Sequence, residues 1–445
     1  MKGVFILLRK EADKFIPSHD TVYDVIVAGG GPAGIGAALA AVANGAKTLI
    51  LEATSVFGGV APIALWMPVN RIKFNGVIPE GGKRGGVHDM FVEAIEKFGP
   101  EAYSEKRHPA TDIRGGLSIH PEFLRLAIFE LLEKYGCMYR LYSPVTGVLK
   151  DANKITGVLV SGKNGPTEFH AKIVVDCTGD GDVSYLAGVE MMKGREEDGL
   201  FLPPALLFAL GNVDYDRFYD FEVNHKDKFY EIIRQADSLG YTTCTWYGFD
   251  EASLPGVVSV NNGGVKGWGN IDATDENDMT AAERMGIQAA IDFVRFARQL
   301  EIPGLENCTL IRAGARVAVR DSRRIVGEYI ITAEDSREDM KFEDIVSRRY
   351  GFIDAVGYYS SEMKSGHAYP YRCLVPKEVD NLLVAGRCAS ATHLGFAAGR
   401  GMGEMMGMGQ ATGVAAALCS AKNILPRNID VKEIQKILIS MGVRL

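Results

Sequence analysis

Several common signatures are missing from this sequence. None of its seven cysteines forms a Cys-x-x-Cys motif, which argues against a redox dithiol, a structural zinc site or a clustered iron–sulfur site. We therefore expect no metal. There is no charge-free run of the ~18 apolar residues that a membrane span needs. The apolar run at 4–8 is followed at once by Arg9, Lys10 and Glu11, so it does not resemble a signal peptide. Scattered single cysteines favour a cytoplasmic protein.

An excess of positive charge is also missing. The net charge is −7 and the isoelectric point is about 5.7, which predicts no affinity for nucleic acid or for an anionic membrane surface. With 445 residues, 47% apolar and 24% charged, the chain is typical of a globular protein of two or three units. Glycine is abundant instead, with 51 residues, and this predicts close approaches of the backbone to a ligand.

Residues 23–52 carry the strongest local pattern. The apolar run 23–28 predicts a buried strand, the glycines form Gly29-x-Gly31-x-x-Gly34, and an alanine-rich helix leads to a second strand that ends at Glu52. In such a βαβ unit the glycines admit a diphosphate to the N-terminus of the helix, and the acid accepts hydrogen bonds from ribose. We therefore predict dinucleotide binding by Gly29, Gly31, Pro32, Ala33, Gly34, Glu52 and Ala53.

Two further features favour FAD over NAD. Gly58 and Gly59 follow the acid closely and form a loop that can run along the diphosphate toward a flavin. A distant strand at 381–386 returns to the first pattern and leads into a helix predicted at 401–419, which an isolated nicotinamide domain does not need. No second G-x-G-x-x-G opens a strand–helix unit, so no separate NAD(P)H domain is expected. No histidine lies between Gly29 and Arg84, so we expect the FAD to be non-covalent.

The predicted fold class is α/β. A Rossmann-like, three-layer FAD-binding domain, with a parallel sheet and a β-meander at 139–176, is expected to contain residues 22–200 and 375–445. An α+β substrate or cap domain is expected at 201–374, and residues 1–21 form an N-terminal extension. Within the cap, residues 280–298 are predicted to be a helix with Thr280 as its N-cap. Residues 306–335 are predicted to form strands rich in arginine.

The chain also resembles a known family. The segments VIVAGGGPAGIGAA, VVDCTGDGDVSYLAG, RDSRRIVGEYIIT, YPYRCLVP and NLLVAGRCASATHLGFAAGR are similar to those of bacterial FAD-dependent oxidoreductases. That family is distantly related to the flavoprotein hydroxylases, the thiazole-synthase-like proteins and the fumarate-reductase flavoproteins. The resembling residues lie in 22–62, 173–190, 316–335 and 370–421, about 40% of the chain.

The resemblance implies further FAD contacts. Val145 would meet the adenine through its backbone, and Thr178, Gly179 and Asp180 would line the same side. Gly386 and Arg387 occupy the second flavin-binding turn, where many flavoproteins have Gly-Asp, so the ribityl contact stays open. The helix after Gly401 would direct its N-terminus at the flavin, although its glycines are equally typical of close helix packing.

The candidates for catalysis are His393, Arg400, Arg320, Arg324 and Tyr371. His393 is a candidate acid or base, and Arg400 a clamp for an anionic substrate group. The alternative for His393 is a purely structural histidine, and the alternative for Arg400 is a helix-capping or surface arginine. One of Arg320 and Arg324, which the family pattern places inward, would bind a substrate carboxylate or phosphate, or both belong to an internal salt-bridge network. Tyr371 would face the substrate or pack in a turn. Trp66 and Asn70 are candidates for the edge of the flavin, with core packing as the alternative for Trp66.

These features predict an oxidoreductase that transfers a hydride between a small-molecule substrate and flavin N5. The alternatives are a flavoprotein that modifies RNA, which the acidic isoelectric point disfavours, and an electron carrier without its own substrate, which the cap region disfavours. The electron acceptor is unknown, and a homo-oligomer is left open.

Overall fold

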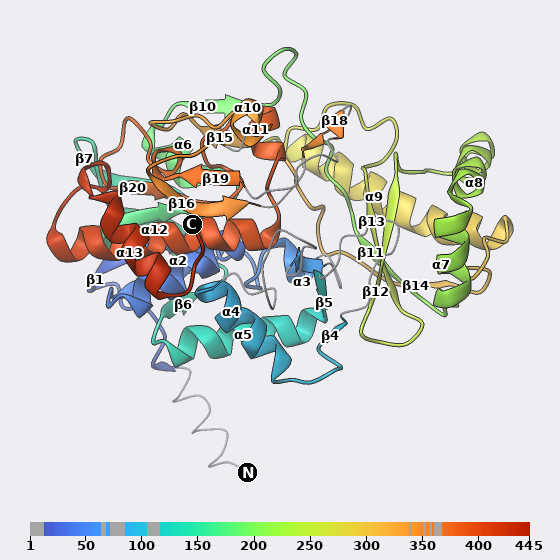
Figure 1. Cartoon of the computed structure of the whole chain (residues 1–445), viewed down its shortest axis with the longest axis horizontal. Helices are drawn as coiled ribbons and strands as arrows, with labels where there is room; N and C mark the ends of the chain where they lie inside the picture. The colour runs from blue at the N-terminus through green and yellow to red at the C-terminus, as the bar shows by residue number, and fades with distance from the viewer. Residues whose placement is uncertain are drawn as a thin grey trace, which may run out of the picture.

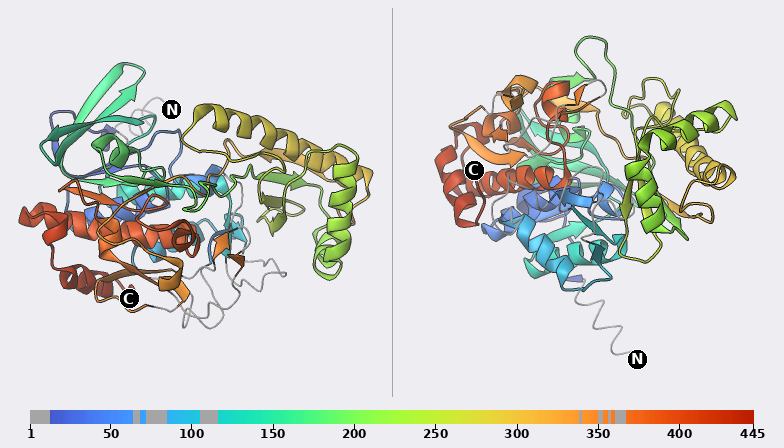
Figure 2. Two further views of the ribbon diagram at one scale, coloured as in Figure 1. Left: turned by 90° about the horizontal axis from the view of Figure 1, so that it is seen from above. Right: turned by 45° about the vertical axis from the view of Figure 1, so that its right-hand side comes forward.

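The computed structural model describes residues 13–63, 68–71, 85–104, 116–337, 340–349, 353–355, 358–359 and 367–445. Two bodies of secondary structure lie side by side in Figure 1, each around its own hydrophobic core. The larger contains the central sheet with α2 and α12. The smaller contains β11 to β14 with α7, α8 and α9, and the views in Figure 2 show it projecting from the first.

The centre of the larger body is a parallel sheet in the order β6-β2-β1-β9, with β20 added to β9. β2, β20 and the ends of β1 and β9 are buried, as expected when both faces of a parallel sheet are covered. Their bounds are β1 Val22–Ala28, β2 Thr48–Leu51, β6 Met138–Arg140, β9 Gly165–Asp176 and β20 Leu382–Val384.

The first part of β9 belongs to the predicted meander. It pairs antiparallel with β8, Lys154–Gly162, which pairs with β7, Val145–Asp151. The short helix α6, Asp182–Ala187, packs against β7. The meander lies over one face of the sheet and the helices α2 and α12 over the other (Figure 2), so the predicted three-layer arrangement is confirmed.

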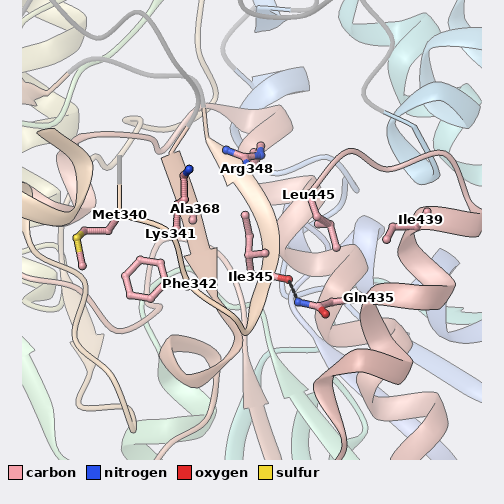
Figure 3. Close-up of a pocket in the computed structure, with 9 residues that line it drawn as sticks. All are labelled: Met340, Lys341, Phe342, Ile345, Arg348, Ala368, Gln435, Ile439 and Leu445. Carbon is pink, nitrogen blue, oxygen red and sulfur yellow. Dashed lines mark hydrogen bonds between the residues drawn. The ribbon is translucent and has the colours of Figure 1, made fainter. Parts of the chain in front are cut away.

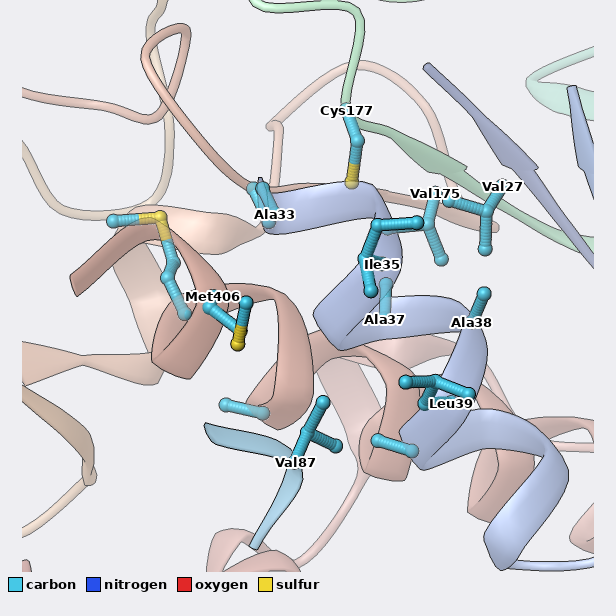
Figure 4. Packing of buried hydrophobic residues seen from close by; sticks show 14 of the residues in the cluster. Val27, Ala33, Ile35, Ala37, Ala38, Leu39, Val87, Val175, Cys177 and Met406 are labelled. Atoms are coloured by element: carbon cyan, nitrogen blue, oxygen red, sulfur yellow. The ribbon is translucent and has the colours of Figure 1, made fainter. Parts of the chain in front are cut away.

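Helix α2, Pro32–Ala43, and helix α12, Met402–Lys422, pack on each other over much of their length. A Cβ added at Gly409 would lie 1.9 Å from the Ala33 carbonyl oxygen, and one at Gly36 would lie 2.2 Å from the Met406 carbonyl oxygen. Figure 4 shows the two helices running alongside each other, with Ala33 on one and Met406 on the other. Small residues therefore let the two backbones almost touch.

The remaining elements of the larger body surround this pair. Tyr139 donates its backbone amide to Phe15, which ties part of the predicted N-terminal extension to β6. The other elements are α3 Val60–Ile63, β3 Pro68–Arg71, α4 Val87–Glu96, β4 Tyr103–Ser104, β5 Gly116–Ile119, α5 Pro121–Lys134, β10 Met191–Lys193, β15 Arg323–Ile325, α10 Ala333–Arg337, β16 Ile345–Arg349, β17 Asp354–Ala355, β18 Tyr358–Tyr359, β19 His367–Pro370, η2 Tyr371–Leu374, α11 His393–Ala397, η3 Pro426–Asn428 and α13 Val431–Ser440.

The smaller body is an antiparallel sheet in the order β12-β13-β11-β14, with helices against it. Its core is aromatic, centred on Phe208, Phe249 and Phe293. The bounds are β11 Phe208–Gly211, α7 Tyr215–Asn224, α8 Lys226–Ser238, β12 Tyr247–Glu251, β13 Val258–Asn262, α9 Glu276–Gln299 and β14 Thr309–Ala313.

Two expectations about this region differ from the structure. Helix α9 begins at Glu276, not near Thr280, because the side chain of Asp275 accepts the amides of Asn277 and Asp278 and caps it one turn earlier. The second core ends at Val317, whereas the sequence placed the cap boundary at 374. β16 and β19 pack with the first body. Residues 306–335 contain the strands β14 and β15, which carry arginine as expected.

No helix in the described part of the chain combines the length and the apolar character needed to cross a bilayer.

Candidate functional site

The turn after β1 is closed by contacts between backbones. At Gly29 the φ angle is +97°, and an added Cβ would lie 2.3 Å from the Cys177 carbonyl oxygen. At Gly34 an added Cβ would lie 1.8 Å from the Gly29 carbonyl oxygen. The protein's own packing therefore requires glycine at both positions, as predicted for a tight turn and for close packing of helix and strand.

Gly31 is different, because no atom of the protein lies close to the position that a Cβ would take there. Its φ of −70° is open to any residue, and the nearest atom to an added Cβ would be the Gly59 Cα, 3.9 Å away. Gly31 is also the N-cap of α2, where it offers no capping side chain. Free space beside uncapped amides at the start of a helix fits a diphosphate. The residues of this turn are therefore suited to hold a dinucleotide.

Glu52 lies directly beside this turn and is only 7% exposed. Its Oε2 accepts the Gly30 amide at 2.8 Å, while its Oε1 accepts the Thr54 amide at 2.8 Å and the Thr54 hydroxyl at 2.7 Å. The carboxylate is thus fixed at the end of β2, where the sequence predicted a ribose contact. Thr54 was missed, although a threonine two residues after an acid is a common local partner. Ala53 is exposed between them.

The loop at Gly58 and Gly59 lies against the same turn. The Gly58 amide donates to the Gly30 carbonyl oxygen at 2.7 Å. Gly58 has φ of +103°, and a Cβ on Gly59 would be 3.0 Å from the Gly31 Cα and 3.3 Å from Pro32. The predicted loop and the predicted diphosphate turn therefore form one surface.

Residues distant in sequence reach this surface from two sides. Gly386, with φ of +106°, approaches Ala33 so closely that an added Cβ would be 3.2 Å from the Ala33 Cβ. On the other side, the Ser143 amide donates to the Glu52 carbonyl oxygen at 2.8 Å, and β7 begins two residues later at Val145. The second predicted flavin turn and the predicted adenine contact thus flank the βαβ turn.

The turn after β9 is organised by Asp176, which is fully buried and accepts from Thr178 and Ser184. Beyond it, Asp180 forms an ion pair with Arg387 at 2.7 Å. Arg387 also bonds the Ser322 hydroxyl at 2.7 Å, and an atom of Arg387 would be 3.1 Å from a Cβ on Gly179. The arginine that replaces the usual aspartate therefore has its partner on the neighbouring turn.

His393 is the first residue of α11 and its side chain is 4% exposed. Its Nδ1 lies 2.8 Å from the Oδ2 of Asp321, and Arg324 lies 2.5 Å from the other carboxylate oxygen. Burial opposes ionisation, but the contacts with His393 and Arg324 hold the pKa of Asp321 below its ordinary value. Asp321 was missed from the sequence, where the only available signal was its i, i+3 spacing to Arg324.

The arginines of this region are largely occupied by protein groups. Arg324 is 0% exposed and also donates to the carbonyl oxygens of Ala391 and Gly194. Arg320 donates to the carbonyl oxygens of Pro203 and Asn262 and lies over the Trp246 ring. This geometry is the internal network given above as the alternative to substrate binding, so neither arginine is kept as a substrate ligand.

Arg400 lies at the junction of the two bodies. Its Nη1 donates to the Arg320 carbonyl oxygen at 3.3 Å, and Arg320 in turn reaches β13 of the smaller body through Asn261 at 3.2 Å. Through Arg320, Arg400 is therefore linked to the smaller body.

Tyr371 does not fit the predicted role. Its ring is 3% exposed in the first core, and its hydroxyl donates to the Pro426 carbonyl oxygen at 3.0 Å, beyond the C-terminal end of α12. Burial raises the pKa of Tyr371 well above its ordinary value. Tyr371 packs in the core, and we exclude it from the candidate site. Trp66 and the side chain of Asn70 lie outside the described residues.

The N-terminus of α12 carries an acid that the sequence reading did not use. Glu404 is 3% exposed, and a Cβ on Gly401 would lie 2.0 Å from its Oε2. The carboxylate therefore sits at the first turn of α12 and offsets part of the positive end of the helix dipole. Gly409 serves contact with α2, as the packing alternative predicted.

A separate hollow of about 350 Å³ lies between β16, β19 and α13. Figure 3 shows Lys341 and Arg348 among the residues that line it, and Gln435 bonded to Ile345. None of the residues predicted to bind FAD lines it.

Residues 24–438 match the family described as FAD dependent oxidoreductase. The chain belongs to this family. The match spans both bodies, and it agrees with the resemblance seen in the sequence and with the geometry of the turn. The cofactor of the family is FAD, for which the turn at Gly31 is suited.

Two curated relatives and one solved structure illustrate the similarity. The digeranylgeranylglycerophospholipid reductases of Thermoplasma volcanium and Picrophilus torridus are each 27% identical, over 205 and 208 residues, which is 44% of this chain and 49% of theirs. This chain thus matches about half the length of these relatives. The myxobacterial chondrochloren halogenase CndH, described as a variant of FAD-dependent halogenases, has a TM-score of 0.50 at 15% identity, over 94% of this chain and 78% of its own. It supports the fold alone.

Proposed function

We propose that this protein is an enzyme that binds FAD non-covalently and oxidises or reduces a small molecule. The observation that carries the proposal is the open space at Gly31, next to uncapped helix amides, with Gly386 closing in on Ala33. The proposed FAD contacts are those of Gly29, Gly31, Pro32, Ala33, Gly34, Glu52, Ala53, Gly58, Gly59, Val145, Thr178, Gly179, Asp180, Gly386 and Arg387. When bound, FAD supplies a hydride acceptor or donor.

The chain's own residues would prepare the substrate. His393 would move a proton, because histidine is the side chain most often used as a general acid or base. Arg400, at the junction between the bodies, would bind an anionic group of the substrate. The relatives named as reductases of a phospholipid leave the substrate of this chain open, because only half of their length is matched.

Two other functions have less support. A protein that modifies RNA is expected to present a basic surface, whereas this chain has a net charge of −7. An electron carrier needs no second body, whereas residues 206–317 build a complete additional core. A cytoplasmic location is part of the proposal, and the seven free, buried cysteines agree with it.

The test is anaerobic reduction of the purified protein by a panel of metabolites. We expect a yellow protein whose flavin absorbance is bleached by one class of small molecule, and then restored by oxygen, a quinone or NAD(P)⁺, which identifies the acceptor. A colourless protein that stays colourless after incubation with excess FAD would contradict the proposal.

The proposed proton transfer has its own test. His393→Ala should slow bleaching by roughly 10²–10⁴-fold, the usual contribution of a general acid or base, and should keep its FAD. His170→Ala is the matched control, because this histidine lies on the meander with its side chain 40% exposed. Equal bleaching rates in the two variants would remove His393 from the mechanism.

A further inference from the structure

We propose that Asp321 is a positioning residue that fixes the tautomer of His393, and that Arg324 holds Asp321 in the orientation this requires. The inference rests on the proposed function, since it concerns the same histidine. It gives a role to the buried acid that the sequence did not reveal.

The geometry of the pair is specific to one ring nitrogen. The Nδ1 of His393 lies 2.8 Å from the Asp321 Oδ2, with side-chain exposures of 4% and 1%. The two atoms are close but not aligned as a hydrogen bond, and neither has another hydrogen-bond partner among the described residues. A carboxylate oxygen carries only lone pairs, so at this distance Nδ1 must carry a proton, because two facing lone pairs would repel each other. In the neutral ring, Nε2 is then left as the acceptor, with no hydrogen-bond partner among the described residues.

Asp321 itself has little freedom. Its other oxygen, Oδ1, lies 2.5 Å from the Arg324 Nη1. The remaining sides of that guanidinium donate to the Ala391 carbonyl oxygen at 2.9 Å and to the Gly194 carbonyl oxygen at 2.7 Å. Because these three hydrogen bonds fix Arg324, it always bonds the same carboxylate oxygen of Asp321. The other oxygen therefore faces His393.

A backbone hydrogen bond also fixes the position of His393. Asp321 and His393 are, in addition, connected to the turn that is proposed to bind FAD. The His393 amide donates to the Glu196 Oε1 at 2.8 Å. The residue next to Asp321, Ser322, donates to Asp180 at 2.6 Å and accepts from Arg387 at 2.7 Å. Arg387 directly follows Gly386, which lies against Ala33. The orientation of His393 is thus set relative to the turn that is proposed to hold the flavin.

The positioning role predicts that the tautomer of His393 changes when Asp321 is replaced, whereas a purely structural ion pair predicts no such change. In Asp321→Asn, Arg324 still requires an acceptor, so the amide oxygen turns to Arg324 and the amide NH₂ faces His393. Nδ1 must then accept, and the proton moves to Nε2. Substitution of a carboxylate by its amide behind a catalytic histidine elsewhere produces such a wrong tautomer.

The experiment is nitrogen-15 NMR of the full-length protein with bound FAD and labelled histidine, from pH 6 to 9, with His393→Gln used to assign the signal. The neutral ring should carry its proton on Nδ1 in the wild type and on Nε2 in Asp321→Asn. Adding Arg324→Met to Asp321→Asn should restore Nδ1–H, because the amide oxygen is then free to face the ring. A wild-type ring protonated on Nε2, or a tautomer unchanged in Asp321→Asn, overturns the proposal.

If Asp321→Asn does not fold, Asp321→Ala gives the second reading, since the loss of the acceptor should shift the proton to Nε2. An Asp321→Ala ring that keeps Nδ1–H also overturns the proposal. Asp335→Asn is the control for removal of a buried carboxylate, because Asp335 accepts from Tyr329 and Thr332 instead. The readout needs no substrate, so a failed metabolite screen and a failed tautomer prediction are distinguishable.

Discussion

The two bodies of this protein are packed by opposite means. Between α2 and α12 the contacts are made by glycine and alanine, and an added Cβ at Gly413 would lie 2.2 Å from the Ala37 carbonyl oxygen. In the smaller body, α9 packs through large rings, and Phe293 lies 5.4 Å from Phe208 and 4.9 Å from Tyr247 between centroids. At these glycines between α2 and α12 there is no room for an added atom, whereas the second core depends on the volume of its rings.

The difference between the two cores determines how each should respond to a substitution. Close backbone contact places the start of α2, the turn at Gly386 and α12 within reach of one elongated ligand. The smaller body is instead an antiparallel sheet with helices against it, and aromatic rings fill the space between them. The first core should therefore be most sensitive to added volume and the second to lost volume.

The largest effect is expected for Phe293→Ala. Phe293 is fully buried, so its truncation should destabilise the smaller body by about 3–5 kcal/mol. Urea unfolding followed by circular dichroism measures the loss, and the flavin absorbance reports whether the first core is affected. We expect the flavin to remain bound at urea concentrations where the smaller body has already unfolded.

Ile291→Ala is the matched control, because Ile291 lies on the same helix and is 36% exposed. Its effect should stay near zero. Release of flavin in step with the unfolding of the Phe293→Ala variant would show that the two cores are one cooperative unit.

Gly409→Ala should have the next largest effect. Its Cβ would meet the Ala33 carbonyl oxygen at 1.9 Å, and a backbone atom cannot rotate away. Overpacking of this kind costs about 1–3 kcal/mol, and it should also weaken FAD binding, because Ala33 belongs to the diphosphate turn. The melting temperature and the flavin content of the purified protein measure both.

Gly162→Ala is the control for this substitution, because a Cβ there would meet its nearest neighbour at an ordinary 3.5 Å. If Gly409→Ala melts like Gly162→Ala, then the close contact between α2 and α12 does not set the stability of the first core.

The smallest effect is expected for Asp250→Asn in the smaller body. Burial raises the pKa of Asp250 from 3.8 to about 7. Between these values the folded state binds more protons than the unfolded state, so this residue lowers the free energy of unfolding as the pH rises from about 4 to 7. In full this shift corresponds to about 4 kcal/mol, but Asp250 is only partly buried and solvent reduces the cost. The asparagine variant should therefore gain about 1–2 kcal/mol over the wild type at pH 8 and nothing near pH 4.

Urea unfolding at both pH values checks this prediction. The gain should grow across the window and become level above pH 7. A gain that is equal at pH 4 and pH 8 would show that the carboxyl group is not desolvated in the fold.

The sequence predicted the parts of the fold whose signals are local. The βαβ unit ending at Glu52 was found because strand, glycine turn, helix and acid follow one another within a short stretch. The return of β20 to the same sheet was found because the apolar run at Leu382–Val384 repeats the first pattern. The start of α9 was misplaced because Thr280 and Asp275 both match a cap, and only the structure shows which one the helix uses.

The site beyond the cofactor turn depends on contacts between distant segments. Asp321 and His393 come together because the segment 325–331 hydrogen-bonds to the segment 388–392 that precedes α11, and no sequence motif shows that these two segments are neighbours. Tyr371 was misread because a tyrosine in a family-like segment looks the same in sequence whether it faces a ligand or, as here, the Pro426 carbonyl oxygen. Hydrogen-bond partners that far apart in sequence carry no periodic signal.

The most direct test of the account is Gly31→Ala, measured by titrating the apoprotein with FAD. The fold accepts this methyl group, since φ is −70° and the nearest atom is 3.9 Å away, so the melting temperature of the apoprotein should not change. A diphosphate in the turn would lose its space, and FAD affinity should fall about 100-fold or more, which corresponds to roughly 2.7 kcal/mol. Wild-type affinity for FAD in this variant would contradict the claim that the amides after Gly31 hold the cofactor.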